Sequence, residues 1–320
     1  MSSIDPTSTA VVTTNLADHG FNLLARGKVR DVYEIDKDTL LFVATDRISA
    51  YDVIMKNGIP EKGALLTKIS AYWFRYLSTQ IPSLRTHFVS TTLPPSVTAA
   101  SPTLSPAQLS SLENRSMQVR RLKIFPIEAI VRGYITGSAW NEYARSGTIH
   151  GEPAPAGLQE SQQLPTPIYT PSTKAELGGK DENISRERAA EIVGDARVAA
   201  RIEELALALY NAAAQHARAR GIIIADTKFE FGYDEADPER NVILVDEVLT
   251  PDSSRFWPAE GYTVGRGQDS FDKQFLRDWL TREGLKGKED VAMPDEIVQK
   301  TREKYVEAYE KLTGDKWSSK

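Results

Sequence analysis

One long segment in which polar and apolar residues alternate constrains the fold of this chain most strongly. Residues 221–232 read as a β-strand, and a second apolar segment at 241–249 reads as its neighbour. The linker 233–240 is polar and contains Pro238, which favours a turn between the two strands. The sequence therefore predicts an antiparallel hairpin at this point of the chain.

The hairpin would gather charged side chains on one face. Because side chains point alternately to the two faces of a strand, Asp226, Lys228 and Glu230 share a face, and the hairpin brings Asp246 or Glu247 beside them. Carboxylates and an ammonium group held on rigid strands suit a Mg²⁺–polyphosphate site. The alternative is a solvated sheet face with cross-strand ion pairs.

Composition narrows the class of protein. With 320 residues, the chain can bury a substantial core, and we expect two or three lobes. Its net charge of −5, without a basic stripe, disfavours a nucleic-acid partner. The absence of cysteine excludes disulfides and thiolate catalysis, and four scattered histidines disfavour a histidine-rich metal site. With no leader and no apolar run of membrane length, we expect a soluble, cytoplasmic protein without a membrane partner.

Local patterns divide the rest of the chain. We expect a strand pair at 29–35 and 39–45, a helix at 65–78, strands at 117–124 and 127–132, helices capped by Ser185 and Asp195, and C-terminal helices at 270–283 and 295–312. Residues 90–116, rich in Ser, Thr and Pro, read as a loop or lobe boundary, and 150–183 read as a long connection typical of binding loops or lids. The pattern predicts an α+β fold with an N-terminal antiparallel β lobe (1–116), a central mixed α/β lobe (117–268) and a C-terminal helical region (269–320).

A glycine and two cations mark the first candidate site, Arg26-Gly-Lys-Val-Arg-Asp31. Glycine lets backbone amides approach a phosphate closely, and Lys28 and Arg30 would share a strand face and point at it. The alternative is an ordinary charged hairpin, since this is neither a Walker loop nor a repeated-glycine motif. After the next apolar strand, a second polar loop carries Asp46, Arg47, Ser49 and Asp52. The alternative is an ordinary turn, since Asp and Ser are also common turn residues.

Two further segments combine an arginine with hydroxyl side chains. In Val131-Arg-Gly-Tyr-Ile-Thr-Gly-Ser138, Arg132 and Ser138 could clamp a phosphomonoester through a guanidinium fork and hydroxyl and amide donors. In Asp252-Ser-Ser-Arg255, Ser254 and Arg255 follow the hairpin and could hold an anionic substrate. A glycine-containing turn and a capped turn with a surface arginine are the respective alternatives.

Taken together, these segments resemble the SAICAR synthetase (phosphoribosylaminoimidazole-succinocarboxamide synthase) family in its longer, single-function fungal form. The matching segments occur in family order over about residues 20–280: Gly27–Asp31, Asp46–Asp52, Val131–Ser138, Asp226–Gly232, Asp246-Glu247 and Asp252–Trp257. The resemblance implies a two-lobe nucleotide site, similar to those of ATP-grasp enzymes and kinases. It also implies a ligase that joins L-aspartate to carboxyaminoimidazole ribotide (CAIR), with ATP and Mg²⁺ as cofactors.

The resemblance also implies roles for individual residues. Those implied for ATP are Gly27, Lys28, Arg30, Lys123, Glu128 and Lys228, and those for Mg²⁺, next to the nucleotide, are Glu230 and Asp246. Those implied for CAIR are Asp52, Arg132, Ser138, Ser254, Arg255 and Asp272. Lys28, Lys228 and Arg255 would act in catalysis. We expect a monomer whose partners are the small-molecule substrates.

Two other functions compete with the ligase. A small-molecule kinase would use the same lysines and metal carboxylates, although the His-Arg-Asp and Asp-Phe-Gly motifs of protein kinases are absent from the sequence. A nucleotide-sensing module would bind ATP without consuming it.

Overall fold

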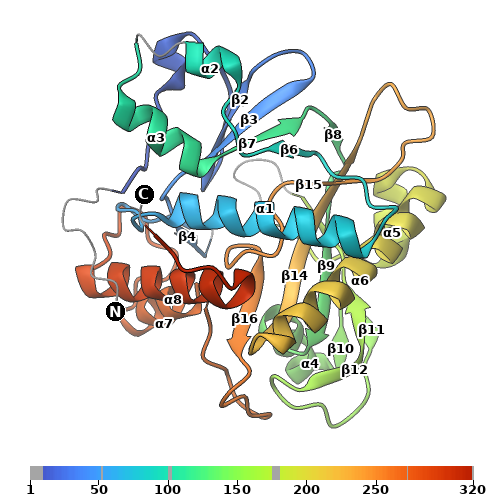
Figure 1. The fold of residues 1–320 in the computed structure, drawn as a ribbon. Coiled ribbons are helices and arrows are strands. Elements are labelled where there is room, and N and C mark those ends of the chain that lie inside the picture. Colours follow the sequence, from blue (N-terminus) through green and yellow to red (C-terminus); the bar gives the residue numbers. More distant parts are fainter. Residues whose placement is uncertain (1–9, 52, 100–102, 175–180, 272, 319–320) are drawn as a thin grey trace. The chain divides into compact units, whose positions relative to one another are not determined.

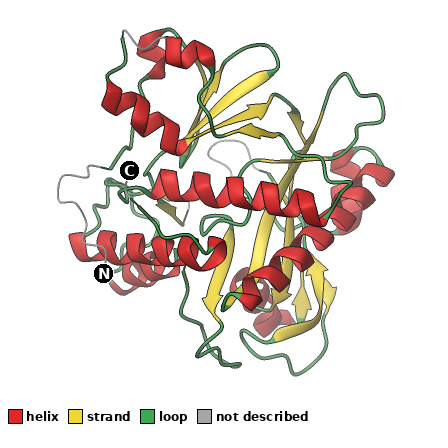
Figure 2. Ribbon diagram, in the orientation of Figure 1, coloured by secondary structure: helices red, strands yellow, loops and turns green. Residues whose placement is uncertain are grey.

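The computed structural model describes residues 10–51, 53–99, 103–174, 181–271 and 273–318. It has an α+β fold, as predicted, with antiparallel sheets and helices in both halves of the chain (Figure 2). The chain divides into two compact units, and the first combines both ends of the chain: Met1–Tyr72, Phe88–Arg121 and Asp272–Lys320. The second comprises Trp73–His87 and Leu122–Phe271. The proposed boundaries at 117 and 269 stay a prediction.

The first unit is built on a five-stranded antiparallel sheet (Figure 1). Its strand order is β1-β2-β3-β7-β6, with β1 at Asn22–Arg26, β2 at Arg30–Glu34, β3 at Thr39–Ala44, β7 at Ser116–Arg120 and β6 at Phe88–Ser90. The unit also contains the short strands β4 (Ser49–Ala50) and β5 (Val53–Ile54), the 3-10 helix η1 (Leu16–His19), and the helices α2 (Pro95–Ala99), α3 (Pro106–Arg115), α7 (Gln274–Arg282) and α8 (Asp295–Thr313). Helix α1 (Lys62–Gln80) begins here and ends in the second unit.

Side chains on one face of β2 and β3 form one hydrophobic core of this unit, so buried and partly exposed residues alternate along these strands. Tyr33, Leu41 and Val43 are fully buried and pack with Val97 of α2 and Leu112 of α3. The predicted strand pair at 29–35 and 39–45 is therefore confirmed. The described part of 90–116 contains α2 and α3, so it is not a continuous loop, and the alternative of a lobe boundary stays a prediction. Helix α3 begins with a capping box, in which Ser105 and Gln108 satisfy each other's backbone amide groups.

The second unit is built on a larger sheet centred on the predicted hairpin. The main strand order is β12-β9-β14-β15, with β12 at Gln163–Tyr169, β9 at Ile127–Tyr134, β14 at Ile222–Tyr233 and β15 at Ile243–Val245. Strand β13 (Ser172–Thr173) pairs with β9, while β8 (Lys123–Ile124) and β16 (Ser254–Pro258) pair with β14. Glu230 lies opposite Val245, which places Asp246 at the next position. The antiparallel hairpin is confirmed.

Helices and a second small sheet complete this unit. They are α4 (Gly137–Ser146), α5 (Arg186–Val193), α6 (Ala196–Ala219), β10 (Thr148–Ile149) and β11 (Glu152–Pro153). Ser185 and Asp195 cap α5 and α6 as predicted, because each side chain accepts hydrogen bonds from backbone amides of the first turn. The described part of 150–183 is not an irregular connection, since it contains β11, β12 and β13.

Helix α6 packs so closely on the sheet that Tyr210 of α6 leaves no room for a side chain at Gly133 of β9. A Cβ atom on Gly133 would lie 1.9 Å from the hydroxyl oxygen of Tyr210, which itself donates a 2.6 Å hydrogen bond to the carbonyl of Ile224. Because overpacking a core costs about 1–3 kcal/mol, we expect Gly133→Ala to lower the free energy of unfolding by that amount in urea titrations. Tyr210→Phe in the same chain should recover part of the loss, and full stability of Gly133→Ala alone would contradict the packing.

Candidate functional site

Three adjacent strands of the second unit bring two arginines to one buried aspartate. Asp226 of β14 lies opposite Arg132 of β9 on one side and Arg255 of β16 on the other. Nη1 of Arg132 donates to the Asp226 carboxylate at 2.8 Å, and Nη1 of Arg255 donates to the same oxygen. Arg132 is buried, which lowers the pKa of its guanidinium, and Asp226 opposes that shift. We call these three residues the arginine clamp.

Two hydroxyl groups and a glycine lie next to the arginine clamp. Arg132 Nη2 lies 3.2 Å from the Ser138 hydroxyl, and Arg132 Nε donates to the Thr170 hydroxyl at 3.1 Å. Gly137 opens helix α4 with φ +58°, and a Cβ atom there would lie 2.5 Å from Nη2 of Arg255. Glycine suits this position because of its positive φ, and any side chain there would displace the Arg255 guanidinium. Two guanidinium groups beside a helix N-terminus are suited to bind a phosphate monoester.

Further along the same face, β9 and β14 carry a second group of charges. Lys228 pairs with Glu128, and Lys174 pairs with Glu230. Asp246 contributes its negative charge to the same place, since it acts on both Glu230 and Lys174. We call these five residues the ionic cluster. They confirm that Lys228, Glu230 and Asp246 come together, as the alternation and the hairpin predicted.

The electrostatics of the ionic cluster favour a cation. Burial, followed by the negative charge of Asp246, raises the pKa of Glu230 to about 7, while Lys174 lowers it. A divalent cation between the two carboxylates would relieve this repulsion, so the residues fit Mg²⁺. Among the described residues no group of three or more His, Asp or Glu side chains is arranged to hold a metal.

In the first unit, the glycine and two cations form a turn. Lys28 is exposed and lies between β1 and β2, so the prediction that it shares a strand face with Arg30 was wrong. The sequence pattern did not reveal β1, which precedes the turn. The Gly27 amide donates to the Arg30 carbonyl at 2.7 Å, and the Arg30 guanidinium lies 5.0 Å from the centre of the Phe42 ring. This is a closed hairpin turn with Lys28 at its tip.

The polar loop after β3 is largely structural. Asp46 is fully buried and accepts hydrogen bonds from the amides of Val11 at 2.7 Å and Gly63 at 2.9 Å, and from Arg115 at 2.9 Å. Its carboxylate therefore joins the N-terminal segment, helix α1 and helix α3. Asp52 of this loop, and Asp272 further on, were predicted to contact CAIR, and both lie outside the described residues.

Two predicted residues have partners outside both clusters. Ser254 is buried, and its hydroxyl is 2.8 Å from that of Thr227, on the face of β14 opposite Asp226. The side chains of Ser254 and Arg255 therefore point to opposite faces of the sheet. Lys123, on β8, forms an exposed ion pair with Glu235 at 3.1 Å.

Comparison with known proteins identifies the family. The sequence model of SAICAR synthetase matches residues 23–294 of the chain. The chain belongs to the SAICAR synthetase family. It is 58% identical over 313 residues to the phosphoribosylaminoimidazole-succinocarboxamide synthase of Saccharomyces cerevisiae, covering 96% of this chain and 99% of the relative.

Solved structures agree with this assignment. The Saccharomyces cerevisiae SAICAR synthase complexed with SAICAR superposes with a TM-score of 0.85 at 56% identity, covering 96% of this chain and 99% of that one. A SAICAR synthetase in complex with ADP matches at a TM-score of 0.66 and 25% identity, covering 92% and 99%. The fold and the fungal-like form expected from the motifs are confirmed.

Three residues of the candidate site were given a different role, or none, from the sequence. Asp226 was placed on the charged face but not paired with arginines, and Lys174 and Thr170 lie in a segment interpreted as a loop. The alternation of polar and apolar residues in β12 is interrupted by Pro165 and Pro167, so strand periodicity gave no signal there. The pairing of Asp226 with Arg132 also needed the register of β9 against β14.

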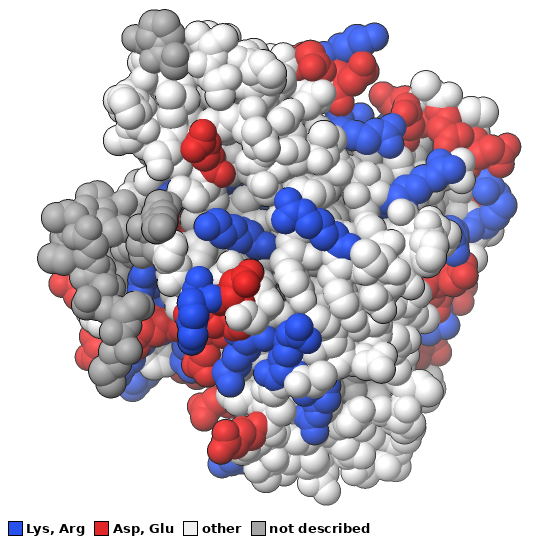
Figure 3. All heavy atoms as spheres, viewed as in Figure 1, with Lys and Arg blue, Asp and Glu red and all other residues white. Residues whose placement is uncertain are grey.

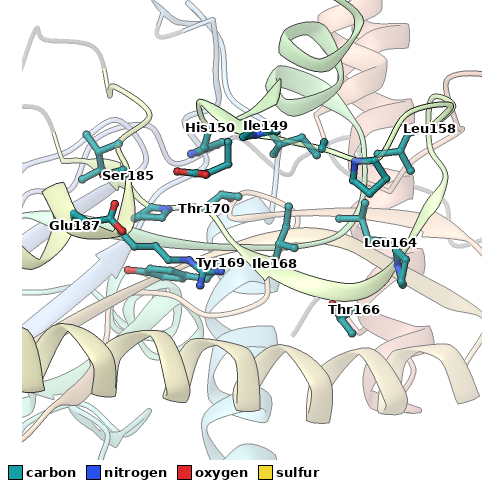
Figure 4. Close-up of a pocket in the computed structure, with 18 residues that line it drawn as sticks. Ile149, His150, Leu158, Leu164, Thr166, Ile168, Tyr169, Thr170, Ser185 and Glu187 are labelled. Carbon is teal, nitrogen blue, oxygen red and sulfur yellow. The ribbon is translucent and has the colours of Figure 1, made fainter. Parts of the chain in front are cut away.

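A cavity of about 550 Å³ lies beside Thr170 (Figure 4). Ile149 and His150 stand on one side, and Leu164, Ile168 and Tyr169 stand across from them. The walls are mainly apolar, and most of the other lining residues are Pro153, Ala154, Pro155, Leu158, Pro165, Pro171 and Ile184. Because Thr170 also binds Arg132, the cavity adjoins the arginine clamp.

His150 in this cavity wall gives a pH-dependent prediction. It forms a two-residue turn with Gly151 in which both φ angles are positive, a geometry that favours Asn-Gly. Burial, and then the charge of Arg132, lower the pKa of His150 from about 6.5 to about 4. The unfolded chain therefore binds a proton more readily than the folded one, and stability falls as the pH drops from about 6.5 towards about 4.

We expect His150→Asn to remove this loss. In urea unfolding, the variant should match or exceed the wild type at pH 7, and its advantage should grow at pH 5. His19→Asn, in helix η1, is the matched control. An advantage that stays constant between the two pH values would contradict the assignment.

One face of the molecule carries charged side chains of both signs (Figure 3). On the face shown in Figure 3, Lys and Arg side chains are interspersed with Asp and Glu. No helix in the described part of the chain is long and apolar enough to cross a membrane.

Proposed function

We propose that the chain catalyses the ATP-dependent ligation of L-aspartate to the carboxylate of CAIR, giving SAICAR, ADP and phosphate. The observation that carries this proposal is that one sheet face holds the arginine clamp, suited to a ribotide phosphate, beside the ionic cluster, suited to a metal–polyphosphate group. The relatives with bound SAICAR and bound ADP support both ligand classes.

The chemistry explains why ATP is needed. A carboxylate is a poor acylating agent because its leaving group would be oxide. Transfer of the γ-phosphoryl group of ATP to the CAIR carboxylate gives an acyl phosphate and ADP. The amine of aspartate then attacks the carbonyl carbon, an amide bond forms, the C–O bond to phosphate breaks, and the amine loses a proton. The acyl-phosphate route uses no protein nucleophile, and the absence of histidine and cysteine from the matched motifs is consistent with it.

The residues of the second unit divide between the two substrates. Arg132, Ser138 and Arg255 would bind the ribotide phosphate, since fork-shaped donors and a hydroxyl match its oxygens. Lys228 would neutralise charge on the transferred phosphoryl group. Glu230 and Asp246 would hold Mg²⁺, which when bound supplies charge neutralisation at the phosphates. The Ser254 hydroxyl lies beside Thr227 on the other strand face, and the role of Lys123 at ATP stays a prediction from the family resemblance.

The turn of the first unit is proposed to bind the ATP phosphates. Lys28 is exposed at the tip of the turn, and the backbone of Gly27 allows close approach. Arg30 and, near adenine, Glu128 remain predictions from the family resemblance. The same holds for Asp52 and Asp272 on CAIR, and for a monomeric enzyme acting in the cytoplasm.

A coupled ADP-release assay tests the proposal. With CAIR, aspartate, ATP and Mg²⁺ present, ADP and phosphate should appear in equal amounts, and omitting any one component should stop their release. A kinase would instead release ADP without aspartate and leave a stable phosphorylated product. A nucleotide-sensing module would bind ATP and release no ADP. Either result would overturn the ligase assignment.

A further inference from the structure

The turn that carries Lys28 is fixed from inside the first unit by one buried arginine. Arg47 donates from Nη2 to the carbonyl of Gly27 at 2.9 Å and from Nε to the carbonyl of Lys28 at 3.4 Å. Its Nη1 reaches the carbonyl of Val12 at 2.7 Å. One guanidinium group therefore joins the turn to the N-terminal segment.

The next carbonyl of the turn is also bound. The backbone amide and the hydroxyl of Thr45 donate to the carbonyl of Val29 at 2.9 Å and 2.8 Å. Three successive carbonyl groups, at Gly27, Lys28 and Val29, thus each have a donor, and both donor residues come from the end of β3 and the loop that follows it. This arrangement fixes the peptide planes on both sides of Lys28, whose side chain is left exposed to solvent.

Asp31 provides the negative charge that pairs with the buried guanidinium group of Arg47. Its carboxylate, with no exposed surface, accepts a 2.7 Å hydrogen bond from Nη2 of Arg47 and a 2.5 Å hydrogen bond from the hydroxyl of Thr14. Only arginine offers planar donors in a fixed fork that can reach several carbonyl groups and a carboxylate at once. A lysine at this position would keep the charge but could not reproduce these contacts.

We propose that Arg47, supported by Asp31, is a positioning residue that holds the Gly27–Lys28–Val29 backbone so that Lys28 meets the phosphates of ATP. This inference rests on the proposed role of Lys28. The nitrogens of Arg47 all donate to groups of the protein, so its proposed effect on ATP is indirect. Its contribution is to orient the turn before ATP binds, which removes an ordering cost from the binding step.

Isothermal titration of Mg·ATP, without CAIR or aspartate, tests the proposal independently of turnover. We expect Arg47→Gln to weaken ATP binding about 10-fold, the order of effect of losing one hydrogen bond to a charged group. The ATP affinity of Arg47→Lys should lie between those of the wild type and Arg47→Gln. If Arg47→Gln does not fold, the Arg47→Lys variant can still be measured. Binding of CAIR should not change in either variant.

Arg115→Gln is the matched control. Arg115 is equally buried and paired with Asp46, but its contacts go to Asp46 and the carbonyl of Ala44 rather than to the turn. It should lose stability in urea while keeping its affinity for ATP. If Arg115→Gln weakens ATP binding as much as Arg47→Gln does, the effect is general destabilisation and the proposal fails.

A double-mutant cycle with Lys28→Met tests whether Arg47 affects ATP binding through Lys28. If Arg47 acts through Lys28, the double variant should bind ATP no more weakly than Lys28→Met alone. Additive losses would overturn the positioning role, as would wild-type ATP affinity in Arg47→Gln. Unchanged ATP affinity in Lys28→Met would instead remove the proposed ATP contact of the turn, and the positioning role with it, while leaving the ADP-release result untouched.

Discussion

Asp226→Asn is expected to lower the free energy of unfolding by about 3–5 kcal/mol, the usual cost of leaving a buried charge without its partner. Arg132 is the buried charge in question, since only 4% of its side chain is exposed. Its other partners, Ser138 and Thr170, are neutral, and Arg255 adds a like charge nearby. Urea unfolding monitored by tryptophan fluorescence measures the loss.

Two controls test whether the loss of stability comes from the unpaired charge of Arg132 or from poorer packing of the new side chain. Arg132→Met combined with Asp226→Leu removes both charges and should regain much of the stability, although it should not bind CAIR. Inorganic phosphate should stabilise Asp226→Asn, because an anion between the two arginines supplies the missing charge. It should not stabilise the double variant. An Asp226→Asn chain as stable as the wild type would show that the arginine clamp is not held by this carboxylate.

The local features of the site followed from the sequence because they depend on short, continuous segments of the chain. Alternation along β14 placed Asp226, Lys228 and Glu230 on one face, and the polar linker with its proline gave the hairpin that brings Asp246 near them. The helices capped by Ser185 and Asp195 were predictable for the same reason, since capping depends on a few consecutive residues.

The features that sequence analysis missed depend on contacts between distant segments. Ser254 and Arg255 are neighbours in the sequence, yet only the register of β16 against β14 shows that Arg255 faces Asp226. Arg47 looked like a ligand-binding residue of a polar loop, whereas its donors are used by carbonyl groups up to 35 positions away. Patterns of local periodicity contain no information on such pairs.

Glu230→Gln is expected to separate stability from activity. Burial and the adjacent Asp246 already raise the pKa of Glu230 to about 7, so its negative charge is unfavourable in the protein without ligands. Replacing the carboxylate by a neutral amide relieves the repulsion, and Lys174, with 39% of its side chain exposed, remains solvated when it loses its partner. The free energy of unfolding should therefore stay the same or increase.

Turnover should nevertheless fall by about 10²–10³, because one group that stabilises charge in the transition state is typically worth about 2.7–4 kcal/mol. The ADP-release assay at saturating ATP, CAIR and aspartate measures this loss, and the Mg²⁺ concentration needed for half-maximal rate should rise, since one of two proposed ligands is gone. Glu235→Gln, on the exposed part of the same hairpin, is the matched control and should behave as the wild type. A Glu230→Gln enzyme with near-normal turnover would remove Glu230 from the metal site. If Glu230→Gln lowers both turnover and the free energy of unfolding, the ion pair between Glu230 and Lys174 is a structural contact. A carboxylate that serves only to bind Mg²⁺ should not be needed for the stability of the fold.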